Sequence, residues 1–270
     1  MTFLWDLGLD IGHSVRTIAE CIEESVADLT VITNLMESRF LSGNQILYDD
    51  LMFGLSPDKI WPGDQFFSAK LEEQKNRHQR FGETGYKLEP NLKESPGGLR
   101  DLHMLSWVTK RYFKINSVDE LLDRGFLTKK ECDQLNSSRD FLWKVRFALH
   151  LTAGRKEDRL LFDYQYDLAK AMGFEQPTRN EAIESFMQVY YRTVMQIERL
   201  QEMLLQYFDE AILHPDDTLE ILRINKRFHL HQGYIEASGD NIFKRYPFAL
   251  LEIFLLIQQD PEIKLSLIHI

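Results

Sequence analysis

Cysteine is scarce in this sequence, and so are long apolar runs. Only Cys21 and Cys132 are present, too few for a disulfide framework or a thiolate metal site. No run reaches the roughly 18 apolar residues of a membrane-spanning helix, and the opening residues lack the basic and apolar regions of a signal peptide. We therefore expect a cytoplasmic protein that is neither exported nor anchored in a membrane.

Positive charge is also in deficit. The chain has 42 acidic and 32 basic residues, a net charge of −10, and the acidic residues are spread along its length. Such a surface disfavours phosphate-rich polymers and anionic lipid. We expect no nucleic-acid partner and no membrane partner.

Helical patterns dominate what is present. From Leu99 onward apolar residues recur at three- and four-residue steps, which predicts long amphipathic helices and, to bury their stripes, an antiparallel helical bundle. Residues 66–81 predict an exposed charged helix, residues 223–238 a short hairpin, and residues 246–258 a further helix. The stripe predicted to form the bundle core or a helix-packing face comprises Met187, Tyr190, Tyr191, Val194, Ile197, Leu200 and Leu204.

The first candidate site lies near the N-terminus. Residues 3–12 alternate between apolar and acidic or glycine positions, which predicts a strand with Asp6 and Asp10 on one face, and a helix is predicted to start near His13 or Ser14. Carboxylates on one strand face can hold Mg²⁺ against a triphosphate, since hard cations prefer carboxylate oxygen. A solvated strand face is the alternative interpretation.

The second candidate is the segment from Asn91 to Asp101. Adjacent Gly97 and Gly98 would let backbone N–H groups approach an anion at a helix start, and Lys93 and Arg100 would complete a phosphate site. The spacing matches neither a Walker nor a dinucleotide motif, so a glycine turn that caps a helix remains equally open.

A third group of polar residues falls in the segment 146–165. It offers no HExxH pattern, and lone His and Arg side chains on helices are usually solvated or structural. We therefore expect these residues to be solvated or structural and not functional. They are Arg146, His150, Arg155, Arg159, Asp163 and Gln165.

Several long blocks in order resemble the bacterial PII uridylyltransferase/uridylyl-removing family. They span about residues 3–213, with a weaker match to roughly 260, and include LWDLGLDIGHSVRT, DLTVITNLMESRFLSGN, WPGDQFFSAKLEEQKNRHQRF, YKLEPNLKESPGGLRDLHMLSWVTKRYF, FLWKVRFALHLTAGRKEDRLLFDYQ and MLLQYFDEAIL. The core of the fourth block is also similar to one in glutamine synthetase adenylyltransferases.

The resemblance implies transfer of UMP from UTP to a tyrosine of the signalling protein PII, with Mg²⁺, and its removal when the effector glutamine is abundant. By resemblance, Asp6 lies where the family places its third metal carboxylate, with Asp10 on the same face. His13, Ser14 and Arg16 would lie near the triphosphate. The segment with Lys93, Gly97, Gly98, Arg100 and Asp101 would bind nucleotide.

The departures from the family pattern predict an internal piece of a longer protein. The Gly-Ser turn and Asp-x-Asp strand that supply the first two carboxylates are absent, as are the HD hydrolase pair and the glutamine-sensing ACT pattern. We expect a mainly α fold: residues 1–100 would be the end of a nucleotidyltransferase α/β domain, and residues 101–270 an associated helical domain. Alone, this piece should be inactive in both directions. A non-catalytic helical interaction module is the alternative from a different class. Part of a related glutamine synthetase adenylyltransferase-like nucleotidyltransferase is the alternative within the same class.

Overall fold

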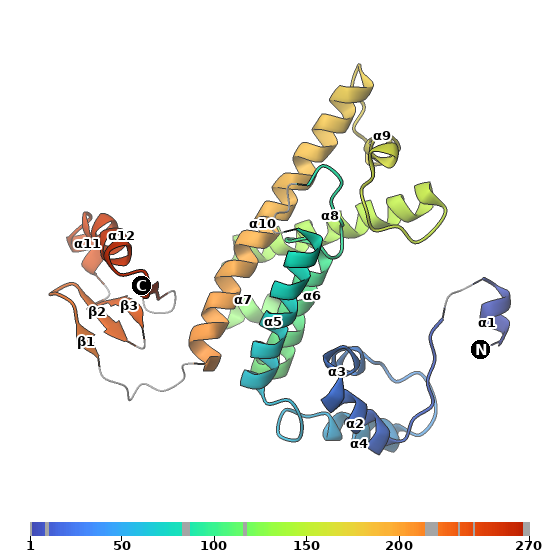
Figure 1. The fold of residues 1–270 in the computed structure, drawn as a ribbon, viewed down its shortest axis with the longest axis horizontal. Helices are drawn as coiled ribbons and strands as arrows, with labels where there is room; N and C mark the ends of the chain where they lie inside the picture. The colour runs from blue at the N-terminus through green and yellow to red at the C-terminus, as the bar shows by residue number, and fades with distance from the viewer. Residues whose placement is uncertain are drawn as a thin grey trace. The chain divides into compact units, whose positions relative to one another are not determined.

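The computed structural model describes residues 2–8, 11–82, 87–115, 118–213, 221–231, 233–239 and 241–266. The chain folds into two compact units, Met1–Ala69 and Lys70–Ile270 (Figure 1). It is mainly helical with one small sheet, which confirms the predicted fold class at that level. The units divide inside a helix, and the predicted domains 1–100 and 101–270 remain a prediction.

The first unit is built from short helices, three of which begin at a side-chain cap. They are α1 (Thr2–Asp6), α2 (Ile18–Ala27), α3 (Leu29–Met36), α4 (Gln45–Gly54) and the first residues of α5 (Gly63–Phe81). Thr17 and Glu20 form a reciprocal capping box at α2, and Asp28 caps α3. The start of α2 therefore lies at Thr17, later than the predicted His13 or Ser14.

The strand predicted for residues 3–12 is wrong where the structure describes it, because Thr2–Asp6 is helical and residues 11–17 pair with no strand. A strand satisfies its backbone only beside another strand, and the strands among the described residues all lie between Leu222 and Leu265. The segment instead bonds locally, from Leu7 N–H to Phe3 C=O and from Gly8 N–H to Trp5 C=O.

Helices form the body of the second unit, which begins inside α5. They are α6 (Leu99–Val108), the π-helical turn η1 (Thr109–Phe113), α7 (Val118–Asp123), α8 (Lys129–Ala153), α9 (Phe162–Ala171) and α10 (Arg179–Leu213). α10 packs against α6, α8 and α9. The core stripe predicted on α10 is confirmed, since all its members are buried except the half-buried Tyr191.

A small sheet follows α10 in the sequence, with strand order β1-β2-β3-β4. Its strands are β1 (Leu222–Arg223), β2 (Phe228–His231), β3 (Tyr234–Ala237) and β4 (Lys264–Leu265); β1, β2 and β3 run antiparallel, and β4 runs parallel to β3. The β2–β3 pair confirms the predicted hairpin.

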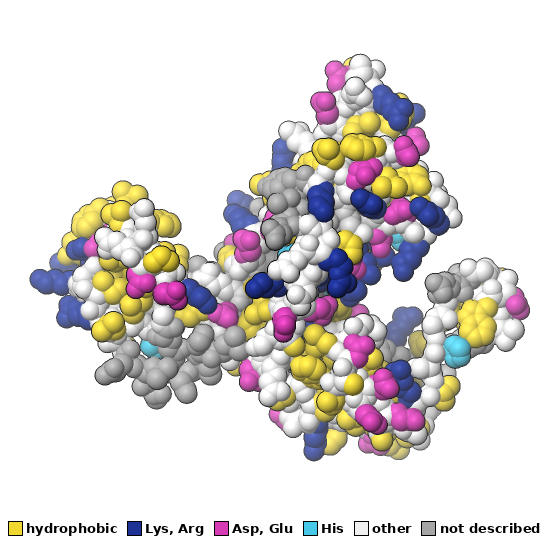
Figure 2. All heavy atoms as spheres, viewed as in Figure 1, with side chains coloured by type: hydrophobic (Ala, Val, Ile, Leu, Met, Phe, Trp, Pro, Cys, Tyr) yellow, Lys and Arg dark blue, Asp and Glu magenta, His cyan; other side chains and the backbone are white. Residues whose placement is uncertain are grey.

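Two helices accompany the sheet, α11 (Ile242–Arg245) and α12 (Ala249–Gln259). The predicted helix at 246–258 is confirmed as α12, which packs Ala249 and Ile253 onto Phe228 and Ile235 of the sheet. Large apolar side chains also remain exposed on α12, and hydrophobic atoms gather there in Figure 2. Among the described residues, no helix combines the length and apolar character needed to cross a bilayer.

Candidate functional site

The predicted site residues fall into both units. Asp6 ends α1 on an exposed surface, and Asp10 lies outside the described residues. His13, Ser14 and Arg16 are exposed in the segment before α2, where the His13 ring lies 5.1 Å from the ring of Trp5. Their convergence with the 91–101 segment, which belongs to the other unit, stays a prediction.

The 91–101 segment is a turn that satisfies its own backbone. The Asn91 Oδ1 atom accepts from the N–H groups of Lys93 (3.0 Å) and Glu94 (2.8 Å), and Ser95 N–H donates to Asn91 C=O. Gly98 N–H donates to Ser95 C=O at 2.9 Å. These N–H donors have partners within the turn, and phosphate binding by the turn and by the side chains of Lys93 and Arg100 remains a prediction.

Both glycines of the turn are required by close packing. Gly97 adopts φ +69°, a left-handed conformation that favours glycine, and a Cβ there would lie 2.5 Å from Val194 C=O of α10. A Cβ on Gly98 would lie 2.7 Å from Ser95 C=O. The paired glycines therefore let the turn lie directly against α10 at the start of α6.

Asp101, in the first turn of α6, is fully buried and holds the turn to α5. Its carboxylate accepts hydrogen bonds from Gly97 N–H (2.8 Å), Gln74 Nε2 (3.2 Å) and the Arg77 guanidinium, and His78 Nε2 lies 3.0 Å away. Asp101 has no exposed surface, and its predicted contact with a nucleotide stays a prediction. It positions Arg77.

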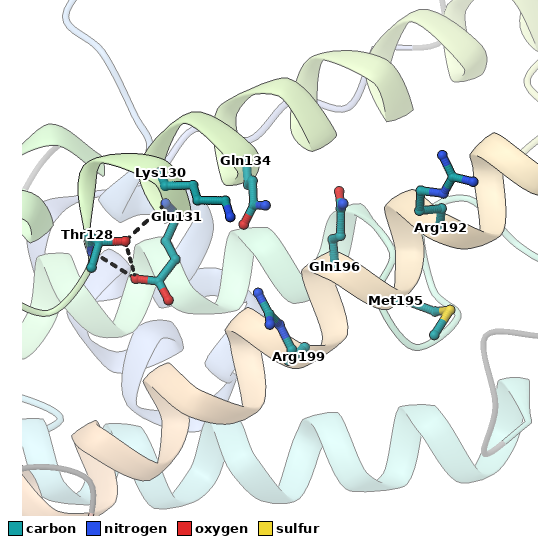
Figure 3. Close-up of a pocket in the computed structure, with 8 residues that line it drawn as sticks. All are labelled: Thr128, Lys130, Glu131, Gln134, Arg192, Met195, Gln196 and Arg199. Carbon is teal, nitrogen blue, oxygen red and sulfur yellow. Dashed lines mark hydrogen bonds between the residues drawn. The ribbon is translucent and has the colours of Figure 1, made fainter. Parts of the chain in front are cut away.

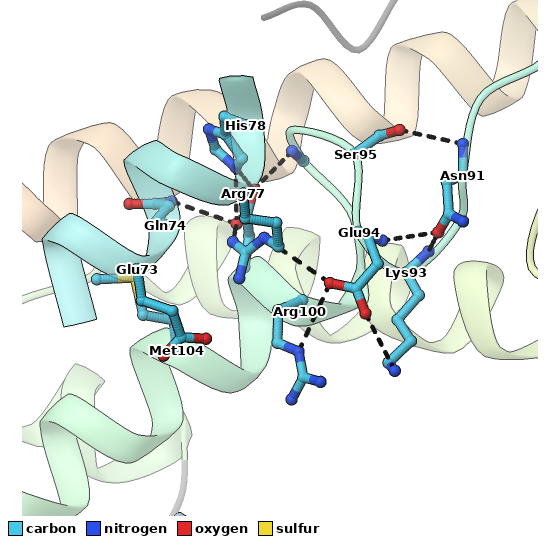
Figure 4. A network of polar contacts seen from close by, with 12 residues as sticks. Glu73, Gln74, Arg77, His78, Asn91, Lys93, Glu94, Ser95, Arg100 and Met104 are labelled. Carbon is cyan, nitrogen blue, oxygen red and sulfur yellow. Dashed lines mark hydrogen bonds and ion pairs between the residues drawn. The ribbon is translucent and has the colours of Figure 1, made fainter. Parts of the chain in front are cut away.

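Glu94 is the centre of a second, half-exposed charge cluster (Figure 4). Lys93 Nζ lies 3.0 Å from one of its oxygens, while Arg100 Nε (3.8 Å) and Arg77 Nε (4.0 Å) lie near the other. The buried Arg77 Nε has no hydrogen-bond partner in the described part of the chain. This cluster therefore holds cations in place while leaving one guanidinium donor unused.

A hollow of about 400 Å³ opens beside this cluster. Three guanidinium groups and two carboxylates line it, together with an amide and an aromatic ring: Glu73, Asn76, Arg77, Arg80, Phe81, Glu94 and Arg100. Arginine forks match the geometry of phosphate oxygens. The hollow can therefore take an anionic group that competes with Glu94 for its cations.

The contribution of α5 was missed from sequence. Residues 66–81 were predicted to form an exposed helix, yet Lys70, Gln74 and Arg77 are at most 8% exposed. These three positions are spaced i, i+4 and i+7, so they share one helix face. This spacing is the sequence signal that could have revealed a buried face, but polar residues spaced in this way normally indicate a face exposed to solvent.

In the 146–165 group, Arg146, His150 and Gln165 make contacts within the protein that stabilise the fold. Arg146 Nε lies 2.7 Å and His150 Nε2 3.1 Å from Asp158 Oδ1. Burial opposes charge on Asp158, but the hydrogen bonds from Arg146 and His150 outweigh it and lower its pKa. Buried Gln165 donates to two backbone carbonyls. Within the described residues, no cluster of three His, Cys, Asp or Glu side chains could hold a metal ion.

Comparisons with known proteins place this geometry in context. Residues 65–205 match the sequence model of the family described as GlnD PII-uridylyltransferase, and residues 228–267 match that of the uridylyltransferase GlnD third domain. Similar curated proteins are named bifunctional uridylyltransferase/uridylyl-removing enzyme. Those of Pseudomonas fluorescens SBW25 and Pseudomonas putida W619 are 52% and 51% identical over 264 residues, which is 98% of this chain. The chain spans only 29% of the length of these relatives. No solved structure matches it.

Proposed function

Because the chain belongs to the GlnD PII-uridylyltransferase family, we propose that it is the central helical part of a uridylyltransferase. In the proposed reaction, a tyrosine oxygen of a PII signalling protein attacks the α-phosphorus of UTP, and pyrophosphate leaves. The observation that carries a role for this chain is the hollow lined by Arg77, Arg80 and Arg100, which lies within the matched region.

The chemistry that this hollow supplies is electrostatic. Phosphoryl-type transfer requires mostly positioning and charge stabilisation from a protein. Arg100 at the rim and Arg77, held by Asp101, present guanidinium groups from two different helices. We propose that they hold the phosphates of UTP, with Lys93 as a further cation.

The finer expectations of the family also belong to this proposal. They are the antiparallel bundle arrangement, Mg²⁺, cytoplasmic location, glutamine as effector and removal of UMP by parts outside this chain. Asp6 is exposed and belongs to no group of three His, Cys, Asp or Glu side chains among the described residues, and one carboxylate does not make a Mg²⁺ site.

Titration of UTP with Mg²⁺ by calorimetry tests the nucleotide proposal. The chain alone should bind UTP poorly, because it brings one predicted carboxylate in place of three. A version extended toward the N-terminus to include the Asp-x-Asp strand should bind it. In that version Arg100→Ala and Lys93→Ala should each weaken binding at least severalfold, whereas Lys144→Ala, an exposed cation outside the hollow, should not.

The alternative is a helical interaction module without a nucleotide site. The internally satisfied glycine turn favours it, since packing against Val194 alone explains Gly97. Unchanged UTP affinity in both the Arg100 and the Lys93 variants of the extended protein would support this alternative and reject the nucleotide site.

A further inference from the structure

A second hollow, of about 530 Å³, lies between the start of α8 and the middle of α10 (Figure 3). Its lining shares no residue with the first hollow, which lies beside Glu94. From α8 and its cap come Thr128, Lys130, Glu131 and Gln134, and from α10 come Arg192, Met195, Gln196 and Arg199. It is therefore a separate feature of the second unit.

The lining of this hollow is strongly basic in an acidic chain. It has three cations, Lys130, Arg192 and Arg199, all exposed, and Glu131 is its single carboxylate among the described residues. Across the part of the chain that the structure describes, these cationic side chains form no hydrogen bond or ion pair. Their charge is available to a partner.

Glu131 does not cancel this charge, because it is committed to the helix cap. Its Oε2 atom accepts from both the backbone N–H and the hydroxyl of Thr128, each at 2.8 Å. The backbone hydrogen bond from Thr128 is the main reason that the pKa of Glu131 is lowered, with smaller contributions from Arg199 and Lys130. The carboxylate is thus fixed at the edge of the hollow.

The spacing of the cations suits an extended chain. Arg192 and Arg199 are two turns apart on one face of α10, roughly 10 Å along the axis at 1.5 Å per residue. An extended peptide covers this length in about three residues. Gln134 and Gln196 offer donors and acceptors to a peptide backbone, and Met195 offers an adaptable apolar contact.

We propose that this second hollow is a groove that binds an acidic segment of a partner protein, whose carboxylates pair with Arg192, Arg199 and Lys130. The open position of the cations favours a peptide over a small molecule, because small-molecule pockets usually bury most of their ligand. The inference goes beyond the proposed nucleotide site and does not depend on it.

Fluorescence anisotropy with a fluorescein-labelled octaglutamate peptide tests the groove at low ionic strength. Arg192→Glu with Arg199→Glu should weaken binding by about tenfold or more, because two attractive pairs become repulsive. The control Lys144→Glu with Lys170→Glu changes net charge equally at exposed sites outside the groove, and should change affinity by less than about threefold. Circular dichroism confirms that each variant is folded.

Two outcomes would overturn the proposal. One is an equal loss of affinity in the groove variant and the control, which indicates net charge alone. The other is displacement of the peptide by tripolyphosphate at lower concentration than by unlabelled octaglutamate, which indicates a phosphate site. UTP affinity of the extended protein should be unchanged by the groove substitutions, so failure here is distinct from failure of the nucleotide site.

Discussion

Two acidic side chains of the 91–101 turn differ in what their charge does. Asp101 has no exposed surface and is surrounded by donors, so its charge is compensated within the protein. Glu94 is 19% exposed and lies between the cations that would bind a phosphate. Burial therefore separates a structural carboxylate from one that the phosphate of the proposed site would have to displace.

Neutralising Glu94 should strengthen anion binding. In Glu94→Gln, Lys93 and Arg100 lose their internal counter-charge, and we expect the affinity for tripolyphosphate to rise on the order of fivefold at low salt. Calorimetry at two salt concentrations measures it. Glu72→Gln, on an exposed position of α5 outside the hollow, should have little effect. A weaker affinity in the Glu94 variant would mean that Glu94 positions the cations instead of competing for them.

Gly97 should tolerate alanine far less well than another left-handed glycine. Gly154 has φ +63° with nothing within 4 Å of a Cβ, whereas a Cβ on Gly97 would clash with Val194 of α10. We expect Gly154→Ala to cost about 1 kcal/mol of unfolding free energy and Gly97→Ala at least ~3 kcal/mol. Urea denaturation followed by circular dichroism measures both. Equal costs would show that the turn does not depend on contact with α10.

At the scale of elements, sequence periodicity predicted the helices after Leu99 and the β2–β3 hairpin, because their apolar residues repeat over many turns or alternate between two strands. It failed at residues 3–12, where a short alternating pattern has no paired neighbour to make it a strand. It also failed at α5, whose buried face is polar. A hydrophobic pattern cannot reveal a helix that is buried through hydrogen bonds to Asp101.

Lys70 lies on the buried polar face of α5, and its burial lowers its pKa. It is 2% exposed, its ammonium lies 4.3 Å from the centre of the Trp107 ring, and it pairs with Glu73. Burial lowers the pKa of Lys70 below its usual 10.5, and the hydrogen bond to Glu73 only partly offsets this. The folded state therefore holds this proton less tightly than the unfolded state does.

Stability should respond to pH through Lys70. As pH rises from the lowered pKa toward 10.5, the unfolded state binds more protons at this position, so the free energy of unfolding rises. Relative to Lys70→Met, the unmodified chain should gain stability across that window, by about 1.4 kcal/mol for each unit of pKa lowering. Denaturation at several pH values measures the difference. A stability difference between the unmodified chain and Lys70→Met that does not change with pH would contradict the assigned pKa shift.

At the scale of the whole molecule, sequence resemblance identified the family, while the contacts that join its parts followed from no motif. The small sheet is fastened to the end of α10 by polar contacts. The Tyr234 hydroxyl donates to Asp209, Ser266 donates to Glu210 at 2.9 Å, and Gln206 donates to a backbone carbonyl of β4. Residues about 25 to 60 positions apart in the sequence meet here, and no local sequence pattern predicts these contacts.

Tyr234→Phe should loosen this junction. Burial and the hydrogen bond to Asp209 hold the pKa of Tyr234 well above its usual value, so the phenol remains a donor at neutral pH. Its loss leaves Asp209 with Lys264 at 3.6 Å as its remaining ion pair among the described residues, and we expect a cost of about 1.5–3 kcal/mol, typical of a hydrogen bond to a charged group. Hydrogen exchange should quicken in β2 and β3 while the amides of α8 keep their protection.

The matched control is Tyr246→Phe, which removes a hydroxyl that forms no hydrogen bond among the described residues and should leave the exchange of β2 and β3 unchanged. Equal exchange in the two variants would show that the Tyr234–Asp209 hydrogen bond is not needed, and that the contacts of Ser266 and Gln206 together with the sheet's own core suffice. Four buried side chains form a small core, and small cores rarely stabilise a fold without further attachment. Faster exchange in Tyr234→Phe alone would therefore make α10 the support on which the sheet depends.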